Sequence, residues 1–106
     1  MQRSSGLWRQ IGPVAGFEGG GARVVEVDDR KLAVGRVGDR YFAVDNTCPH
    51  ARASLAAGEM RGQTIVCPLH GWDFNVFTGK CFRFSEKIVS HSVRVQNRIL
   101  EVRLSP

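Results

Sequence analysis

Two short turns constrain the fold of this chain more than any other feature of its sequence. The first reads Cys48-Pro49-His50 and the second Cys67-Pro68-Leu69-His70. Each turn offers one thiolate and one imidazole, which are ligands that proteins use for zinc and iron. Four such groups hold one metal centre only if the fold brings the two turns together, so we expect the rest of the chain to do that.

Length and cysteine content describe the class of protein. A chain of 106 residues is typical of one domain, which we expect to span residues 1–106. Of its three cysteines, only Cys81 lies outside the two turns, which argues against a disulfide framework and for a reducing, cytoplasmic location. Residues 1–10 contain no apolar run, and no stretch approaches the roughly 18 apolar residues of a membrane span. We therefore expect neither a signal peptide nor a membrane partner.

The charge balance is basic, with 15 Lys and Arg against 10 Asp and Glu and a formal net charge of +5. The arginines are dispersed from Arg3 to Arg103 and accompany no nucleic-acid-binding motif, so we expect no nucleic-acid partner. Two interpretations stay open: a docking surface for an acidic protein, or an arginine-rich surface that only faces solvent.

Short apolar and β-branched runs separated by turn residues predict an all-β fold, a sandwich or small barrel. The expected strands are 7–11, with Trp8 as a core anchor, and 22–27, 31–37, 40–44, 64–66, 92–96 and 98–104, with shorter alternating runs at 72–74 and 81–84. Asp28-Asp29, Gly38-Asp39 and Gln96-Asn97 are expected hairpin turns. Residues 12–21 read as a loop, and Ser54 to Ala57 as at most one helical turn.

The ligand pattern resembles the Rieske ferredoxin family, whose [2Fe–2S] centre has two cysteines on one iron and two histidines on the other. The resemblance covers most of the chain. It extends to Asp45-Asn46-Thr47, Leu55, Gly58-Glu59, the run from Cys67 to Trp72, Phe74 and Thr78-Gly79. It implies one [2Fe–2S] cluster per chain, with Cys48 and Cys67 on the buried iron and His50 and His70 on the exposed iron. It also implies three antiparallel sheets, with a small cluster-binding subdomain at about residues 45–84.

A structural zinc site with the same four ligands is the alternative to an iron–sulfur centre. Zinc sites usually pair ligands by kind along the chain, whereas thiolate and imidazole alternate here. His91 lies in an expected strand with no cysteine nearby, so we interpret it as structural. Cys81 lies outside both turns, and we expect a small buried residue there.

Four positions predict a low reduction potential. High-potential relatives join the two loops by a disulfide, where this chain has Ala53 and Leu69. They also place a Ser and a Tyr hydroxyl near the cluster sulfurs, where this chain has Trp72 and Phe74. Fewer hydrogen bonds to sulfur stabilise the reduced cluster less, so we expect a potential near roughly −150 mV.

One further difference concerns the segment after the second loop. Related ferredoxins often carry a proline-rich stretch there, but residues 81–90 contain no proline. Phe82 or Phe84 is expected to form the apolar cover of the cluster instead.

The four ligands saturate the two irons, and the chain shows no mononuclear iron site, so we expect an electron carrier and not an enzyme. The resemblance implies a monomeric ferredoxin that passes electrons from a flavin reductase to a terminal oxygenase, such as a ring-hydroxylating dioxygenase. The small Rieske subunit of an assimilatory nitrite reductase is a second interpretation. A zinc-stabilised interaction module is the alternative of another class.

Overall fold

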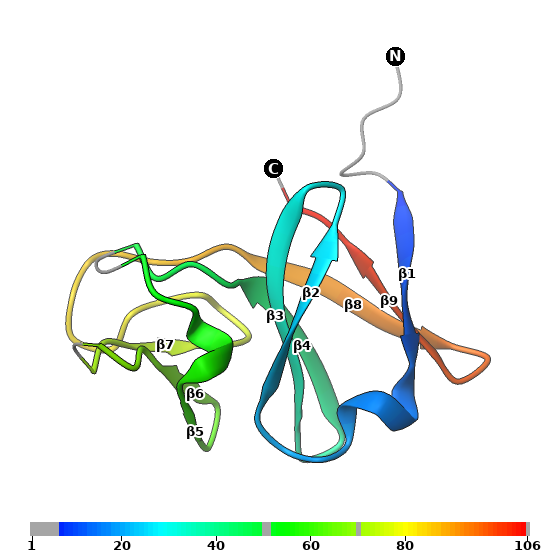
Figure 1. Cartoon of the computed structure of the whole chain (residues 1–106), viewed down its shortest axis with the longest axis horizontal. Coiled ribbons are helices and arrows are strands. Elements are labelled where there is room, and N and C mark those ends of the chain that lie inside the picture. The colour runs from blue at the N-terminus through cyan, green and yellow to red at the C-terminus, as the bar shows by residue number, and fades with distance from the viewer. Residues whose placement is uncertain (1–6, 50–51, 70, 106) are drawn as a thin grey trace.

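The computed structural model describes residues 7–49, 52–69 and 71–105 of the chain. Over these residues the fold is built from nine strands and two single-turn 3-10 helices (Figure 1). The strands are β1 (Trp8–Pro13), β2 (Ala22–Val27), β3 (Arg30–Val37), β4 (Arg40–Asp45), β5 (Glu59–Arg61), β6 (Thr64–Val66), β7 (Asp73–Asn75), β8 (Ser90–Gln96) and β9 (Ile99–Arg103). The 3-10 turns are η2 (Val14–Phe17) and η3 (Leu55–Ala57). The prediction of an all-β chain is confirmed.

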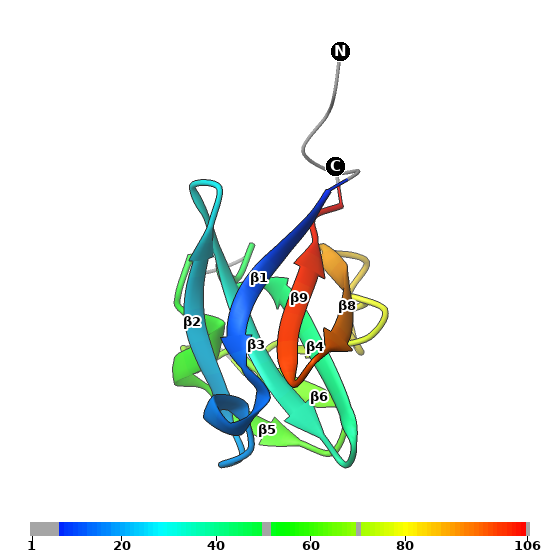
Figure 2. The same cartoon turned by 90° about the vertical axis from the view of Figure 1, so that its right-hand side faces the viewer.

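Six strands form a continuous antiparallel array in the order β1-β9-β8-β4-β3-β2 (Figure 2). Strand β8 joins two groups of strands within it. Its first residues, Ser90 and His91, pair with Val44 and Ala43 of β4, whereas Ser92 to Gln96 pair with β9. Two antiparallel sheets therefore share one strand.

Tight turns set the register of these strands. Asp28 and Asp29 both adopt positive φ, 50° and 67°, as the two-residue turn between β2 and β3 requires. The β8–β9 hairpin turns through Asn97 and Arg98, with φ of 54° and 64°, one residue later than predicted. Cross-strand pairing places Gln96 opposite Ile99, and this pair closes the hairpin.

A third sheet, β5-β6-β7, lies to one side of the large array (Figure 1). Its strands are three residues long, so it has little apolar surface of its own. Ile65 and Phe74 lie opposite each other on it and are fully buried against the large array. Three antiparallel sheets are thus present, as predicted, although two of them are joined through β8.

The buried side chains form two clusters. One fills the large array and contains Leu32, Val34, Leu100 and Val102. The other lies between the large array and the small sheet and contains Phe42, Leu55, Ile65, Phe74 and both cysteines of the predicted turns. The second cluster supports the site described below.

Three local predictions were wrong. Residues 81–84 do not continue as a strand: Cys81 makes an isolated bridge to Phe74, and the backbone then bends. Trp8 is only partly buried, because its ring lies on the sheet surface between the guanidinium groups of Arg94 and Arg103, at 4.2 and 5.1 Å. The loop predicted over 12–21 contains the end of β1 and η2. Within the described residues, no helix has the length and apolar content needed to cross a bilayer.

Candidate metal centre

The first predicted ligand turn begins directly after β4 and is closed by its own backbone. The amide of Cys48 donates to the carbonyl of Ala53 at 2.9 Å, and the amide of Arg52 donates to the carbonyl of Cys48 at 2.7 Å. Arg52 adopts a positive φ of 56°. These two bonds turn the chain back on itself and fix the direction in which Cys48 leaves the loop.

The second turn repeats this pattern after β6. The amide of Cys67 donates to the carbonyl of Trp72 at 2.7 Å, and the amide of Gly71 donates to the carbonyl of Cys67 at 3.1 Å. Gly71 has the positive φ, 72°, that Arg52 has in the first loop. Cys48 and Cys67 are therefore presented by two loops of the same hydrogen-bonded shape, which the sequence spacing alone did not reveal.

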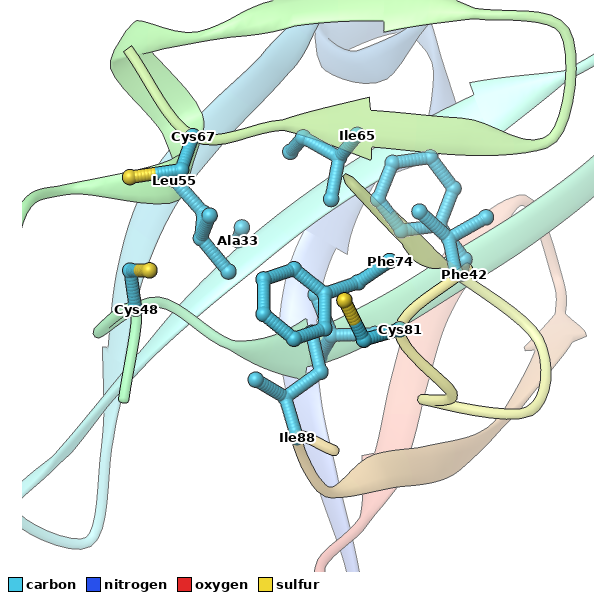
Figure 3. Packing of buried hydrophobic residues seen from close by; sticks show 11 residues of the cluster. Ala33, Phe42, Cys48, Leu55, Ile65, Cys67, Phe74, Cys81 and Ile88 are labelled. Carbon is cyan, nitrogen blue, oxygen red and sulfur yellow. The ribbon is translucent and has the colours of Figure 1, made fainter. Parts of the chain in front are cut away.

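The two thiol side chains lie at the same end of the second cluster, on facing segments (Figure 3). Both are buried, with exposed fractions of 0% and 1%. Leu55 lies between them and the rest of the cluster in the same view. All three cysteines fall within the described residues, and none of them forms a disulfide.

Gly58 explains how closely the two loops approach. A Cβ at this position would collide with the carbonyl oxygen of Val66, the residue before Cys67. The segment that leaves the first loop therefore passes against the backbone that enters the second, which only glycine allows.

Asn46 locks the base of the first loop. Its side-chain oxygen accepts the amide of Ala56 at 2.9 Å, and its side-chain nitrogen donates to the hydroxyl of Ser54 at 2.9 Å. Its backbone carbonyl accepts the amide of Leu55 at 2.7 Å. Because Asn46 is buried, these bonds replace those to water and tie the two ends of the loop together.

The segment after β7 covers the second loop. The rings of Trp72 and Phe84 stack at 4.2 Å with an interplanar angle of 19°. Arg83 Nη2 donates to the carbonyl of Gly71 at 3.1 Å. Phe84 therefore packs against the second loop, whereas Phe82 points into solvent with 84% of its surface exposed.

A partly buried ionic group supports the strand that enters the first loop. Asp45 accepts from Arg30 Nη2 at 3.0 Å and lies 2.8 Å from His91 Nε2. His91 Nδ1 accepts the amide of Ser105 at 2.9 Å, so Nε2 carries the proton that Asp45 accepts. Burial raises the pKa of Asp45, but the His91 hydrogen bond and the charge of Arg30 outweigh it and hold that pKa below its usual value.

His91 therefore has a structural role within the fold, as predicted. Cys81 is buried beside Phe74, also as predicted. The predicted ligands His50 and His70 lie outside the described residues. Arg83 had no predicted role, and Asp45 and Asn46 were named only as part of the family resemblance. The short side chain of Asn46 just before a turn is nevertheless a usual signal for a side chain that ties a loop.

Two thiols at matched positions fit the cysteine half of an iron–sulfur centre. The amides in such turns are also able to donate to cluster sulfurs and tune the potential. Among the described residues, which do not include positions 50 and 70, no three or more His, Cys, Asp or Glu side chains come together as a possible metal site.

Comparison with known proteins points to one family. The Rieske [2Fe-2S] domain matches residues 7–93. Ferredoxin CarAc of Metapseudomonas resinovorans is 42% identical over 74 residues, which cover 69% of this chain and 69% of that protein. The ferredoxin component of the naphthalene 1,2-dioxygenase system of Pseudomonas putida is 35% identical over 83 residues, 76% of this chain and 80% of the relative.

A solved structure agrees. One chain of the complex of reduced oxygenase and oxidized ferredoxin in carbazole 1,9a-dioxygenase superposes on this chain with a TM-score of 0.82. It is 34% identical, and the match covers 91% of this chain and 92% of that one. On its sequence and its fold, this chain belongs to the Rieske [2Fe-2S] domain family.

Proposed function

We propose that this protein is the ferredoxin of a ring-hydroxylating dioxygenase system. It accepts one electron from a flavin reductase and delivers it to a terminal oxygenase. A Rieske domain carries one [2Fe–2S] cluster per chain, and that cluster supplies reversible one-electron chemistry. The observation that carries the proposal is the pair of buried thiols on matched loops in a chain that belongs to this family.

The proposed ligands are Cys48, His50, Cys67 and His70. Burial of both thiols supports their placement on the inner iron. The surrounding residues position these ligands: Asn46 ties the base of the first loop, and Gly58 lets the two loops approach each other.

The proposed domain comprises residues 1–106, with a cluster-binding subdomain at about 45–84. Both loops and the sheet β5-β6-β7 fall within that subdomain, which supports the boundary. A monomer in the cytoplasm completes the proposal, and three cysteines without a disulfide support a reducing compartment.

The family match argues against a zinc-stabilised interaction module. The relatives described above are named as ferredoxins, two of them with a dioxygenase system, which favours a shuttle over a nitrite reductase subunit.

A redox titration with a reconstituted assay tests the function. The purified protein should be red-brown and should bleach reversibly with one electron per chain. In an assay that contains NADH, a flavin reductase and a terminal oxygenase, omission of this protein should abolish substrate oxidation. A colourless protein, or one that exchanges no electron, would contradict the proposal.

A further inference from the structure

Exposed apolar side chains gather at the end of the molecule that carries the predicted ligand loops. Among the described residues, the large apolar side chains that are exposed are Val24, Leu69, Phe82, Phe84 and Val95. Leu69 belongs to the second ligand loop, and Phe82 and Phe84 to the segment beside it. Phe82 and Leu69 are 84% and 62% exposed. Grouped exposed apolar side chains usually mark an interaction surface, whereas single ones need no explanation.

The backbone and neighbouring rings hold this group in place. The amide of Phe82 donates to the carbonyl of Asp73 at 3.0 Å. Arg83 is held by its bond to Gly71, and Phe84 by its stack on Trp72. A partner that binds here therefore has little ordering entropy to overcome.

The charged side chains of the two ligand loops and of the segment 82–85 are all cationic. Arg52, in the first loop, and Arg83 are both exposed. Residues 46–58, 67–72 and 82–85 contain no Asp or Glu.

Four carboxylates border these ranges, and three of them lie beside cations. Asp45 bonds to Arg30 at 3.0 Å. Glu59 pairs with Arg61 at 3.1 Å. Glu86 lines a cavity together with Lys80 and Lys87. The fourth, Asp73, is half-buried, and one of its carboxylate oxygens is buried without a hydrogen-bond partner. Exposed cations therefore predominate on the surface around the two loops, which has an apolar centre.

The opposite end of the molecule uses its arginines differently. Arg94 bonds to Glu101 at 2.7 Å and covers the ring of Trp8, which Arg103 also contacts. Arg94 is thus paired with a carboxylate, whereas neither Arg52 nor Arg83 forms an ion pair within the part of the chain that the structure describes.

We propose that Arg52, Leu69, Phe82 and Arg83 form a docking surface for the electron-accepting partner, and that the partner's matching face is acidic around an apolar depression. The inference rests on the proposed function, because a docking surface at this end matters only if electrons leave there. Leu69 and Phe82 fill the depression, and the two arginines face its carboxylates. Opposite charges speed encounter and fix orientation, while buried apolar contacts hold the complex.

Two small oxidants of opposite charge test the location and sign of this field without a protein partner. The reduced holoprotein is mixed in stopped flow with ferricyanide, a trivalent anion, or with hexaamminecobalt(III), a trivalent cation. Arg83→Glu and Phe82→Glu place negative charge on the docking surface. Arg98→Glu, in the β8–β9 turn, and Val95→Glu are controls with the same changes in net charge. They lie toward the other end of the longest axis, which extends 37 Å (Figure 1).

For an oxidant about 10 Å from Arg83, at an ionic strength of about 10 mM, Arg83→Glu should lower the rate of oxidation by ferricyanide roughly tenfold. The same variant should raise the rate of oxidation by hexaamminecobalt(III) by a similar factor. Phe82→Glu changes the charge by one unit instead of two, so it should shift each rate in the same direction by about threefold. The controls should change either rate by less than about twofold, because screening weakens their longer-range effect. All differences should fade at about 1 M salt.

Equal shifts in surface variants and controls would overturn the docking surface, since only net charge would then matter. Unchanged rates in Arg83→Glu and Phe82→Glu would overturn it as well. A red-brown protein with either result keeps the proposed function, whereas a colourless protein would overturn both proposals.

Discussion

At the scale of single residues, two positions beside the ligand loops carry no hydroxyl group. Phe74 is fully buried in the same cluster as Cys48 and Cys67, and its ring has no polar atom. Trp72 stacks on Phe84 and has no hydroxyl. A cluster bound here would gain no hydroxyl hydrogen bond from these two side chains, consistent with the expected potential near roughly −150 mV.

Phe74→Tyr should raise the midpoint potential. A hydroxyl able to donate to a ligand sulfur favours the reduced form by about 1 kcal/mol, or roughly 40 mV for one electron. A spectroelectrochemical titration measures the change. Phe77→Tyr adds the same hydroxyl outside the ligand loops and should leave the potential unaltered. An equal shift in both variants would show that no specific bond is involved.

Asp45→Asn should lower the free energy of unfolding at neutral pH, because it removes the charged partner of Arg30 and His91. The pKa of Asp45 is lowered by folding, so its contribution is complete above the unfolded pKa of about 3.9 and is lost as pH falls through the lower folded pKa. Denaturant titrations of both proteins should therefore differ at pH 7 and converge below about pH 4. Asp39→Asn, on the exposed β3–β4 turn, is the control. A constant difference between Asp45→Asn and the original protein across this range would contradict the linkage.

At the scale of elements, the two ligand loops are held by different sets of contacts. The first loop depends on the side chain of Asn46 and the absence of one at Gly58. The second loop depends on the segment after β7, through Arg83 and Phe84. Single substitutions can therefore remove the contacts of one loop without touching those of the other.

Asn46→Ala should shorten the lifetime of the bound cluster and cost about 1–3 kcal/mol of stability, because it leaves buried partners of the first loop unsatisfied. Loss of visible absorbance on heating measures the lifetime. Gln63→Ala, at an exposed position in the β5–β6 turn, should have no comparable effect. A lifetime that matches the original protein would mean that the side chain of Asn46 is not needed to hold the loop.

Phe84→Ala should speed bleaching of the cluster in air, because it removes the ring stacked on Trp72 and admits water beside the second loop. Phe82→Ala removes a ring of equal size that is mostly exposed, so its bleaching rate should stay near that of the original protein. If Phe82→Ala were the faster of the two to bleach, the assignment of the cover to Phe84 would be wrong.

Most elements followed from local signals in the sequence. Alternating apolar residues and paired turn residues such as Asp28-Asp29 gave the strands of the large array, because both signals are local. The segment 81–84 alternates equally well but forms no strand. Its conformation depends on contacts of Arg83 and Phe84 with Gly71 and Trp72, which residue spacing does not encode.

At the scale of the whole molecule, long-range contacts join the parts. Arg30, Asp45 and His91 meet from β3, β4 and β8, and β8 itself passes from one sheet to the next. Such contacts were beyond sequence reasoning, since no local pattern pairs residues this far apart. The prediction of the candidate site rests on local information instead, because four ligands of two types at a fixed spacing already limit the metal centre that they can hold.

The central claim is that this molecule is an electron carrier with a cluster of mixed cysteine and histidine ligation. An EPR spectrum of the dithionite-reduced protein tests it most directly. We expect one reduced [2Fe–2S] signal per chain whose average g value lies below that of clusters held by four cysteines. Replacing His50 or His70 by Cys should alter or abolish that signal, whereas His91→Ala should preserve it. A signal of the all-cysteine type, or loss of the signal in His91→Ala alone, would contradict the account.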